Sequence, residues 1–207
     1  MIIGITGGIG SGKSVIARQL RKMGYSVYDT DSEAKRIIVE DATVREQMTA
    51  LFGEEVYQDG VYQTALVAQQ VFADKNLLAK LNAIVHPAVK ADIISKFRSL
   101  GVTSEPSAPS EPLNSDSGLF FIECAILFQA GFDVLCDKVV AVTAPEDIRL
   151  ERVIARDHSD MNKVRARMRA QEADKDLARA DIVINNDGTT PIPTLCEQLL
   201  LELKCEK

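Results

Sequence analysis

The stretch GITGGIGSGKS at residues 4–14 contains five glycines and ends in a lysine followed by a serine. Each glycine raises the entropy cost of ordering the chain, so this concentration indicates backbone that another group must approach closely. Gly7, Gly12, Lys13 and Ser14 satisfy the pattern G-x-x-x-x-G-K-[ST]. An apolar run typical of a buried strand precedes the pattern, a helical pattern starts at Ser14, and a second predicted strand follows that helix. A strand, loop, helix and strand in this order predict an open α/β sheet with a right-handed crossover.

The chemistry of this loop suits a phosphate group bound close to the main chain. Successive backbone N–H groups can turn inward as a nest for phosphate oxygens, and the helix N-terminus adds a partial positive charge. Lys13 can reach the β- and γ-phosphates, and the hydroxyl of Ser14 is a hard ligand for Mg²⁺. A chance glycine-rich turn would not require strand, spacing and helix to agree. The sequence therefore predicts binding of a nucleoside triphosphate with magnesium.

The overall composition argues against several classes of protein. The 207 residues carry a net charge of −6, unlike a protein that coats nucleic acid. The four cysteines form no C-x-x-C pair and two histidines are too few for a zinc site, so we expect reduced thiols. The most apolar stretch, residues 118–135, contains Glu123, Gln129 and Asp133, and it is better interpreted as a buried strand and its sequel than as a membrane span. We expect a cytoplasmic protein without nucleic-acid or membrane partners.

The middle of the chain differs in character from its beginning. Residues 31–101 hold successive helical patterns, and a short polar patch at residues 57–63 interrupts them. Pro87 is expected to end or kink the last of these helices. Residues 102–116 are rich in serine, proline and glutamate, a composition that predicts a mobile surface loop.

The sheet is predicted to resume after this loop. Apolar runs at residues 119–124, 138–143 and 181–185 are typical of buried strands. Pro145 suits the first turn of the helix that follows the second of these runs, and a closing helix is predicted at residues 190–204. We assign residues 1–30, 117–148 and 180–207 to a nucleotide-binding core, 31–101 to a helical substrate-binding insertion, 102–116 to the flexible loop and 149–179 to a lid.

Two main function classes can use such a phosphate loop. A kinase moves the γ-phosphoryl group to a small acceptor, whereas a GTPase switch uses its nucleotide to set conformation. Guanine recognition usually needs N-K-x-D, but NKVR at residues 162–165 lacks the aspartate, and no glycine has an aspartate three residues before it. The kinase interpretation is therefore favoured over a switch, and a non-kinase ATPase module stays open as a lesser alternative.

Two aspartates follow the second predicted strand. If the chain stays extended there, the side chains of Asp29 and Asp31 share one face, at the edge where open α/β sheets bind their ligands. We expect Asp31 to act near the acceptor hydroxyl and Asp29 to lie on the metal side. The competing interpretation is that either aspartate caps the next helix, because D-S-E-A is also a good helix start.

Cationic and acidic side chains complete the candidate site. Arg149, Arg152 and Arg156 are spaced to form one face of a helix, and the planar guanidinium group suits phosphate oxygens. Three further arginines follow at Arg165, Arg167 and Arg169, so a lid over the phosphates is predicted. The alternative is a solvated charged face with Glu146, Asp147 and Glu151 as partners. Glu123 ends the predicted strand LFFIE, where an acid can hold magnesium through water.

The combination of motifs resembles the dephospho-CoA kinase family over nearly the whole chain. The phosphate loop alone is shared by many ATPases, so the specificity comes from its combination with the other matches. These are D-x-D at Asp29 and Asp31, His-Pro at His86 and Pro87, R-[ILM]-x-x-Q at Arg167 and Gln171, and the ending ADIVINNDG at residues 180–188.

The resemblance implies ATP-dependent phosphorylation of the ribose 3′-hydroxyl of dephospho-CoA, giving CoA and ADP, by a monomer or weak homo-oligomer. It also implies an α/β fold similar to nucleoside monophosphate kinases: a five-stranded parallel sheet with helices on both faces, a helical acceptor insertion and an arginine lid. With the arguments above, the candidate ATP-binding residues are Gly8, Ile9, Gly10, Ser11, Gly12, Lys13, Ser14, Val15 and Asn186. Candidate catalytic residues are Asp31, Lys13, Arg152 and Arg156, candidate acceptor-binding residues are Asp31 and His86, and candidate metal ligands are Ser14, Glu123 and Asp29.

The sequence departs from the family pattern at three positions. Ala125 and Gln129 stand where the family commonly has the proline and the acid of P-L-L-F-E, so this chain has no carboxylate at the position of that acid. Val15 replaces a threonine, without consequence for metal binding if Ser14 is the ligand. The residues alone leave the acceptor open, and another kinase of this fold that acts on a nucleotide or a sugar acid is the alternative.

Overall fold

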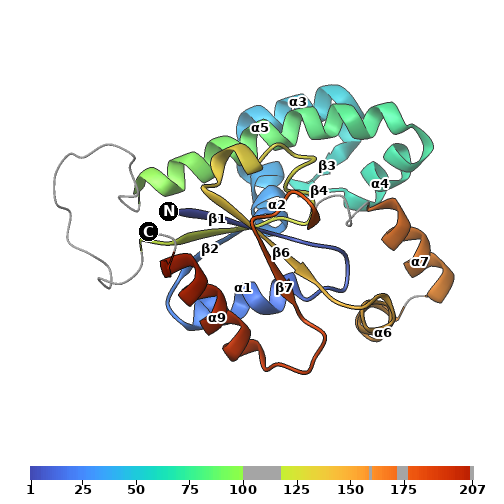
Figure 1. Cartoon of the computed structure of the whole chain (residues 1–207). Coiled ribbons are helices and arrows are strands. Elements are labelled where there is room, and N and C mark those ends of the chain that lie inside the picture. The colour runs from blue at the N-terminus through green and yellow to red at the C-terminus, as the bar shows by residue number, and fades with distance from the viewer. Residues whose placement is uncertain (100–117, 159, 172–176, 206–207) are drawn as a thin grey trace. The chain divides into compact units, whose positions relative to one another are not determined.

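The computed structural model describes residues 1–99, 118–158, 160–171 and 177–205 (Figure 1). The chain divides into two compact units. The sheet unit contains Met1–Tyr28 and Glu111–Lys207, and the helical unit contains Asp29–Ser110. The predicted loop at 102–116 lies outside the described residues, and the finer division into core, insertion and lid stays a prediction.

The sheet unit is built on the parallel sheet that the sequence predicts. Its strands are β1 (Ile2–Thr6), β2 (Ser26–Asp29), β5 (Phe120–Glu123), β6 (Lys138–Thr143) and β7 (Ile182–Asn185), in the order β2-β5-β1-β6-β7. Strand β1 lies at the centre, where Gly4 pairs with Ile122 of β5 and with Val139 of β6. The phosphate loop follows this central strand, so the sheet supports the loop from both sides.

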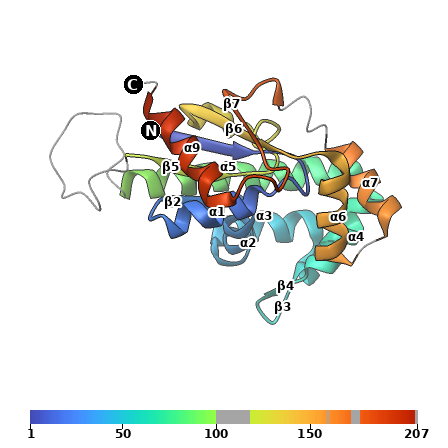
Figure 2. The same cartoon turned by 60° about the horizontal axis from the view of Figure 1, so that its bottom comes forward.

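One face of this sheet is covered by helices α1 (Lys13–Lys22) and α9 (Ile192–Cys205), which pack against each other (Figure 2). Ile3 and Ile5 of β1 point into this layer, where they join Ile16, Leu20 and other buried side chains. The intervening Gly4 points to the opposite face, as the two-residue period of a strand requires. A Cβ atom on Gly4 would lie 2.7 Å from the side chain of Leu127, so the segment after β5 packs directly on the backbone there.

Helices α6 (Glu146–Asp157) and α7 (Met161–Ala170) form a pair with an apolar cluster of their own. Pro145 is the N-cap of α6, one residue before the predicted first turn. Glu146 and Asp147 occupy that turn instead, where negative charge complements the helix dipole. The cluster between the helices consists of Leu150, Val153, Val164 and Met168, with Ile9 and Ile154 packed against it.

The helical unit contains α2 (Thr30–Glu40), α3 (Ala42–Phe52), α4 (Thr64–Ala73) and α5 (Lys75–Ser99). Between α3 and α4, a short 3-10 turn, Glu54–Val56, leads into a hairpin of β3 (Tyr57–Gln58) and β4 (Val61–Tyr62). Asp59 and Gly60 join these strands, both at positive φ. The hairpin was not predicted from this polar segment, although Asp-Gly is a strong signal for a two-residue hairpin turn.

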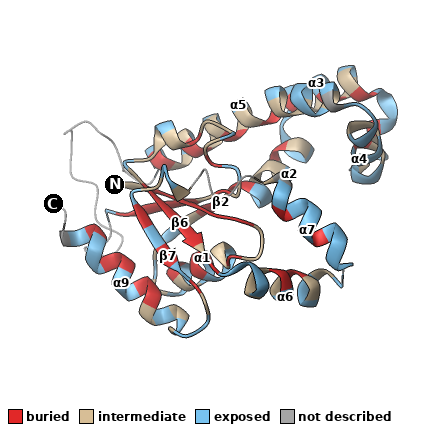
Figure 3. Ribbon diagram, turned by 45° about the vertical axis from the view of Figure 1, so that its right-hand side comes forward, coloured by how far each residue is buried: buried red, intermediate tan, exposed pale blue. Residues whose placement is uncertain are grey.

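Pro87 does not end the last predicted helix, because α5 runs through it to Ser99. Proline removes one backbone hydrogen bond and costs about 3 kcal/mol in a helix interior. Val85, Val89, Ile93 and Phe97 are buried on α5, at the spacing of one helix face. Burial of this apolar face outweighs the local cost, so the helix continues (Figure 3).

Three further sequence predictions concern the thiols, the last elements and the membrane. Among the described residues, Cys124, Cys136 and Cys196 form no disulfide bond, and burial, followed by nearby Asp133, raises the pKa of Cys136 to about 12. Strand β7 and helix α9 lie where the closing strand and helix were predicted. Within the described ranges, none of the helices has the length and apolar character needed to span a bilayer.

Candidate active site

The phosphate loop leaves no room for side chains at three of its glycines. Gly7, Gly10 and Gly12 have φ values of 141°, 82° and 95°, which side chains rarely adopt. A Cβ atom at these positions would lie 2.1 Å from the carbonyl oxygen of Val142, 2.4 Å from that of Arg149 and 2.2 Å from Nδ2 of Asn186. The glycines therefore serve a loop that is enclosed by β6, α6 and the residue after β7.

Lys13 and Ser14 lie at the beginning of α1, as the motif predicts. The ammonium group of Lys13 donates to the carbonyl oxygens of Gly7 at 2.8 Å and Gly8 at 3.3 Å, so it lies across the loop. The N-cap of α1 is Gly12, which has no side chain to occupy the helix N-terminus. Ser14 and Val15 are exposed on the first turn. The loop therefore presents main-chain donors, one cation and one exposed hydroxyl together, as phosphate binding requires.

The residues of the loop fit a magnesium nucleotide better than a metal ion held by protein alone. The described part of the chain contains no group of three or more His, Cys, Asp or Glu side chains that could hold a metal. Mg²⁺ commonly keeps several waters and binds substrate phosphates with few protein ligands, for which the Ser14 hydroxyl suffices. Within the described residues, the Ser11 hydroxyl is fully buried without a hydrogen-bond partner. A buried, unpaired donor in a phosphate loop is consistent with a site for an anionic ligand.

Asn186 and Arg152 brace the other end of the loop. Asn186 is 3% exposed, and its side-chain amide donates to the carbonyl oxygen of Ser11 at 2.8 Å. Its main-chain carbonyl oxygen accepts a hydrogen bond from Arg152 at 2.9 Å. The structure thus brings two predicted residues from distant parts of the sequence to the phosphate loop. Asn186 contacts the main chain of the loop, and Arg152 contacts Asn186.

The arginines of α6 and α7 have different surroundings. Arg149 and Arg152 are partly buried and bond to main-chain oxygens near the loop, whereas Arg156 is exposed. Arg156 forms two hydrogen bonds with Asp157, at 2.6 and 3.0 Å, and Arg167 donates to the same carboxylate at 3.3 Å. The hydrogen bond from Arg156, then its charge and that of Arg167, hold the pKa of Asp157 at about 2. Asp157 therefore gathers two of the arginines that the sequence assigns to a lid.

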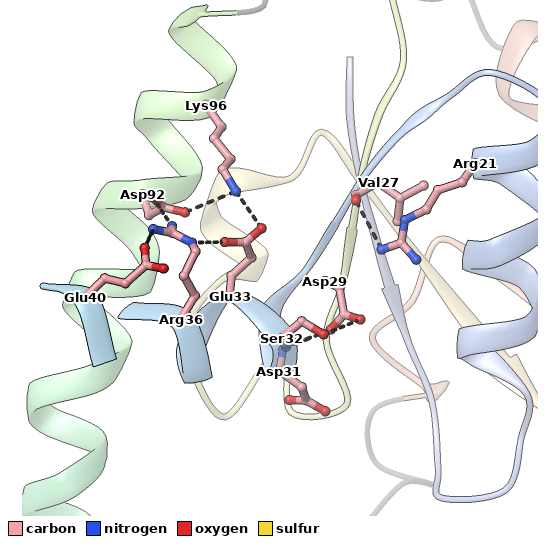
Figure 4. Close-up of polar contacts among 10 residues, drawn as sticks. All are labelled: Arg21, Val27, Asp29, Asp31, Ser32, Glu33, Arg36, Glu40, Asp92 and Lys96. Atoms are coloured by element: carbon pink, nitrogen blue, oxygen red, sulfur yellow. Dashed lines mark hydrogen bonds and ion pairs between the residues drawn. The ribbon is translucent and has the colours of Figure 1, made fainter. Parts of the chain in front are cut away.

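Asp29 and Asp31 occupy different positions at the start of α2 (Figure 4). Asp29 is the N-cap: its Oδ1 accepts the main-chain N–H groups of Asp31 and Ser32, each at 3.1 Å, and its Oδ2 accepts the Ser32 hydroxyl. Asp31 lies one position after Thr30, is exposed, and points its carboxylate away from the cap. Capping therefore applies to Asp29, and the side chain of Asp31 is not used to begin the helix.

An ion-pair network connects α2 with α5, within two helical turns of Asp31 (Figure 4). Lys96 of α5 donates to Glu33 at 2.6 Å, and Arg36 bonds Glu33 at 2.6 Å and Asp92 at 2.7 Å. The hydrogen bond from Lys96, then that from Arg36, lowers the pKa of Glu33 against a partial burial that raises it. The network joins the helix that carries Asp31 to the longest helix of the same unit.

The remaining predicted residues lie at separate places. His86 is on α5, and partial burial lowers the pKa of its imidazole. Glu123 is the last residue of β5 and is partly buried. Ala125 and Gln129 lie in the turns after β5, with Gln129 exposed. The sheet unit contains the phosphate loop, Arg152, Arg156, Asn186 and Glu123. The helical unit contains Asp29, Asp31 and His86.

Gln171 is a residue of this site whose role was not predicted from the sequence. It is the C-cap of α7, and its side-chain oxygen accepts the N–H of Ile9 in the phosphate loop at 2.6 Å. The family motif at Arg167 and Gln171 marked the residue, but no local pattern connects it with a loop so distant in the sequence.

Comparison with known proteins agrees with these features. Residues 1–191 match the model of the family described as dephospho-CoA kinase. A dephospho-CoA kinase of Porphyromonas gingivalis is 43% identical over 178 residues, which cover 86% of this chain and 81% of that protein. One of Bacteroides fragilis is 38% identical over 197 residues, covering 94% and 89%. The structure of dephospho-CoA kinase from Campylobacter jejuni superposes with a TM-score of 0.69 at 22% identity, covering 100% of this chain and 98% of that one, which shows a common fold.

Proposed function

The chain belongs to the dephospho-CoA kinase family, and we propose that its phosphate loop, Asp31 and two arginines of α6, Arg152 and Arg156, carry out the reaction of that family. The reaction is transfer of the γ-phosphoryl group of ATP to the 3′-hydroxyl of dephospho-CoA, which gives CoA and ADP. The observation that carries the proposal is the phosphate loop, in which three glycines, Lys13 and Asn186 are arranged around main-chain donors. The membership sets aside the GTPase and non-kinase ATPase alternatives.

The phosphate loop binds and polarises the nucleotide. Main-chain N–H groups at the start of α1 receive phosphate oxygens, and Lys13 moves from the carbonyl oxygens of Gly7 and Gly8 to the β- and γ-phosphates. Its charge stabilises the negative charge that develops on the transferring group and on the leaving ADP. Ser14 would hold Mg²⁺, which neutralises phosphate charge when it is bound. We assign Glu123 and Asp29 to the magnesium ion, which they would contact through water molecules. The carboxylate of Asp29 is less available for this role, because it already accepts the capping hydrogen bonds.

Asp31 acts on the acceptor. Its carboxylate accepts the hydrogen bond of the 3′-hydroxyl and then its proton, as the new O–P bond forms and the bond to the β-phosphate oxygen breaks. Arg152 and Arg156 neutralise negative charge on the transferring phosphoryl group, and His86 binds the acceptor. We further propose that the enzyme is cytoplasmic and is a monomer or weak homo-oligomer.

A panel of acceptors tests the function directly. Purified protein with ATP and Mg²⁺ is given dephospho-CoA, AMP, dTMP or gluconate, and ADP release is measured together with the position of the new phosphate. Release with dephospho-CoA alone and a phosphate at the 3′-oxygen is expected. Turnover of a nucleotide or gluconate without any turnover of dephospho-CoA would support the alternative kinases of this fold.

A further inference from the structure

Ile9, in the turn of the phosphate loop, is held by α6 and α7 through both its main chain and its side chain. We propose that Gln171 and Arg149 are positioning residues that fasten the loop to these two helices during phosphoryl transfer. The proposal rests on the proposed function for its kinetic consequence, but the fastening itself is a property of the sheet unit.

Both main-chain groups of Ile9 are bonded to side chains of this helix pair. Its N–H donates to Oε1 of Gln171 at 2.6 Å, and its carbonyl oxygen accepts from Nε of Arg149 at 3.1 Å. Gln171 is the C-cap of α7, and Arg149 lies in the first turn of α6. One residue of the loop therefore bonds to both helices at once.

Two further contacts reinforce these bonds. The side chain of Ile9 packs against the apolar cluster of α6 and α7, so the loop contributes to the core of the helix pair. At the next residue, Gly10, a Cβ atom would lie 2.4 Å from the carbonyl oxygen of Arg149, so the two main chains touch. Hydrogen bonds, apolar packing and backbone contact thus converge on two consecutive residues of the loop.

The consequence for catalysis follows from what lies on each side of Ile9. In the proposed function, the loop residues after Ile9 supply main-chain donors to the phosphates, and α6 carries Arg152 and Arg156. Transition-state stabilisation requires donors and cations that are already fixed relative to the transferring group. The hydrogen bonds that Gln171 and Arg149 form with Ile9 keep the phosphate donors of the loop at a fixed position relative to the arginines of α6. Loss of these bonds should therefore lower kcat more than it weakens binding of the acceptor.

The first experiment compares three variants of the full-length enzyme. Gln171→Met keeps the shape of the side chain but removes the acceptor, Gln171→Glu keeps an acceptor oxygen, and Lys163→Met changes an exposed side chain of α7 as a control. We expect kcat to fall about 5- to 20-fold in Gln171→Met, the scale for losing one partner of a partly buried hydrogen bond. KM for dephospho-CoA should change less than about twofold. Gln171→Glu should recover most of kcat, and Lys163→Met should match the wild type.

A second pair of measurements separates positioning from general stability. Amide hydrogen exchange at Ile9 in the protein without nucleotide should accelerate in Gln171→Met and stay slow in Lys163→Met. Because Arg149 and Gln171 act through the same residue, the kcat losses of Arg149→Met and Gln171→Met should not multiply in the double variant.

Unchanged kcat in Gln171→Met, or a lowered melting temperature with kcat intact, would overturn the proposal. Multiplicative effects of the two substitutions would also contradict a shared point of action. If the wild type fails to phosphorylate dephospho-CoA, the proposed function is wrong, and exchange at Ile9 still decides whether the loop is fastened.

Discussion

The carboxyl groups of Asp29 and Asp31 are separated in the chain by Thr30 alone, yet their hydrogen bonds assign them to different tasks. Asp29 satisfies two main-chain donors at the start of α2, which is the usual work of an N-cap. Asp31 supplies one of those donors from its main chain and leaves its carboxylate exposed. The two positions can therefore be tested against each other by their effect on folding: the Asp29 substitution removes a helix cap besides a proposed metal-side carboxylate, whereas the Asp31 substitution should affect chemistry alone.

Asp31→Asn should cut kcat by about 10²-fold or more, the usual scale for removing a positioned base, and leave the melting temperature nearly unchanged. ATP affinity should fall much less. Asp29→Ala should instead destabilise the protein by about 1 kcal/mol, the typical cost of losing an N-cap. Steady-state kinetics and thermal unfolding of both variants check this. A less stable Asp31→Asn protein with ordinary kcat would mean that the catalytic assignment is wrong.

Lys13→Met should keep the fold and lose about 10²-fold or more in kcat, because the lysine stabilises charge on the transferring group. Circular dichroism and thermal unfolding serve as the folding control, since the ammonium group donates to the loop carbonyl oxygens of Gly7 and Gly8. Near-normal kcat in a folded variant would refute the role of the phosphate loop in catalysis.

His86 should make stability depend on pH. Burial lowers the pKa of its imidazole in the folded protein below the ordinary value of 6.5, so the unfolded chain binds the proton more readily. The stabilisation is fully present above about pH 6.5 and is lost as the pH falls through the lowered value. The melting temperature should therefore fall less between about pH 7.5 and 5 in His86→Gln than in the wild type. Parallel pH profiles would show that His86 does not contribute.

At the scale of elements, local patterns predicted most of the fold and contacts distant in sequence explain the rest. The strands of the sheet are apolar runs, and the phosphate loop is a motif with a fixed strand and helix around it, so both were found correctly. Of the two outcomes predicted for Pro87, the helix end is wrong and the kink stays a prediction, because the burial of the apolar face that continues α5 is a tertiary property. Likewise, Ile9 and Gln171 are 162 residues apart, and no periodicity reports such a contact. The phosphate-loop glycines were predicted, but the groups that exclude their side chains were not.

Pro87→Ala should stabilise the protein. Proline in a helix interior costs about 3 kcal/mol relative to alanine, and part of this is offset because proline restricts the unfolded chain by about 0.4–1 kcal/mol. A net gain of about 2–2.5 kcal/mol is expected in denaturant unfolding, since Pro87 is exposed and its ring fills no buried space. An unchanged or lower stability would show that the proline ring or the local bend is needed for packing of α5.

At the scale of the whole molecule, the residues proposed to bind ATP and those proposed to bind the acceptor belong to different units, and Asp29, on the metal side, belongs to the helical unit. The phosphate loop, Asn186 and the arginines of α6 belong to the sheet unit, whereas Asp31 and His86 belong to the helical unit. The chain passes from one unit to the other between Tyr28 and Asp29, at the end of β2. We therefore expect each substrate to bind first to the unit that carries its proposed binding residues.

Hydrogen exchange with one substrate at a time tests this division. A ligand that binds only the folded form suppresses local opening where it makes contacts, by about 2.7 kcal/mol at a concentration of 100 times its Kd. A non-hydrolysable ATP analogue should slow exchange in the phosphate loop, the first turn of α1 and α6. Dephospho-CoA alone should slow exchange in the first turn of α2 and around His86, with AMP as the control for its adenylate part. Protection by dephospho-CoA confined to the sheet unit would contradict both acceptor assignments, because neither Asp31 nor His86 lies there.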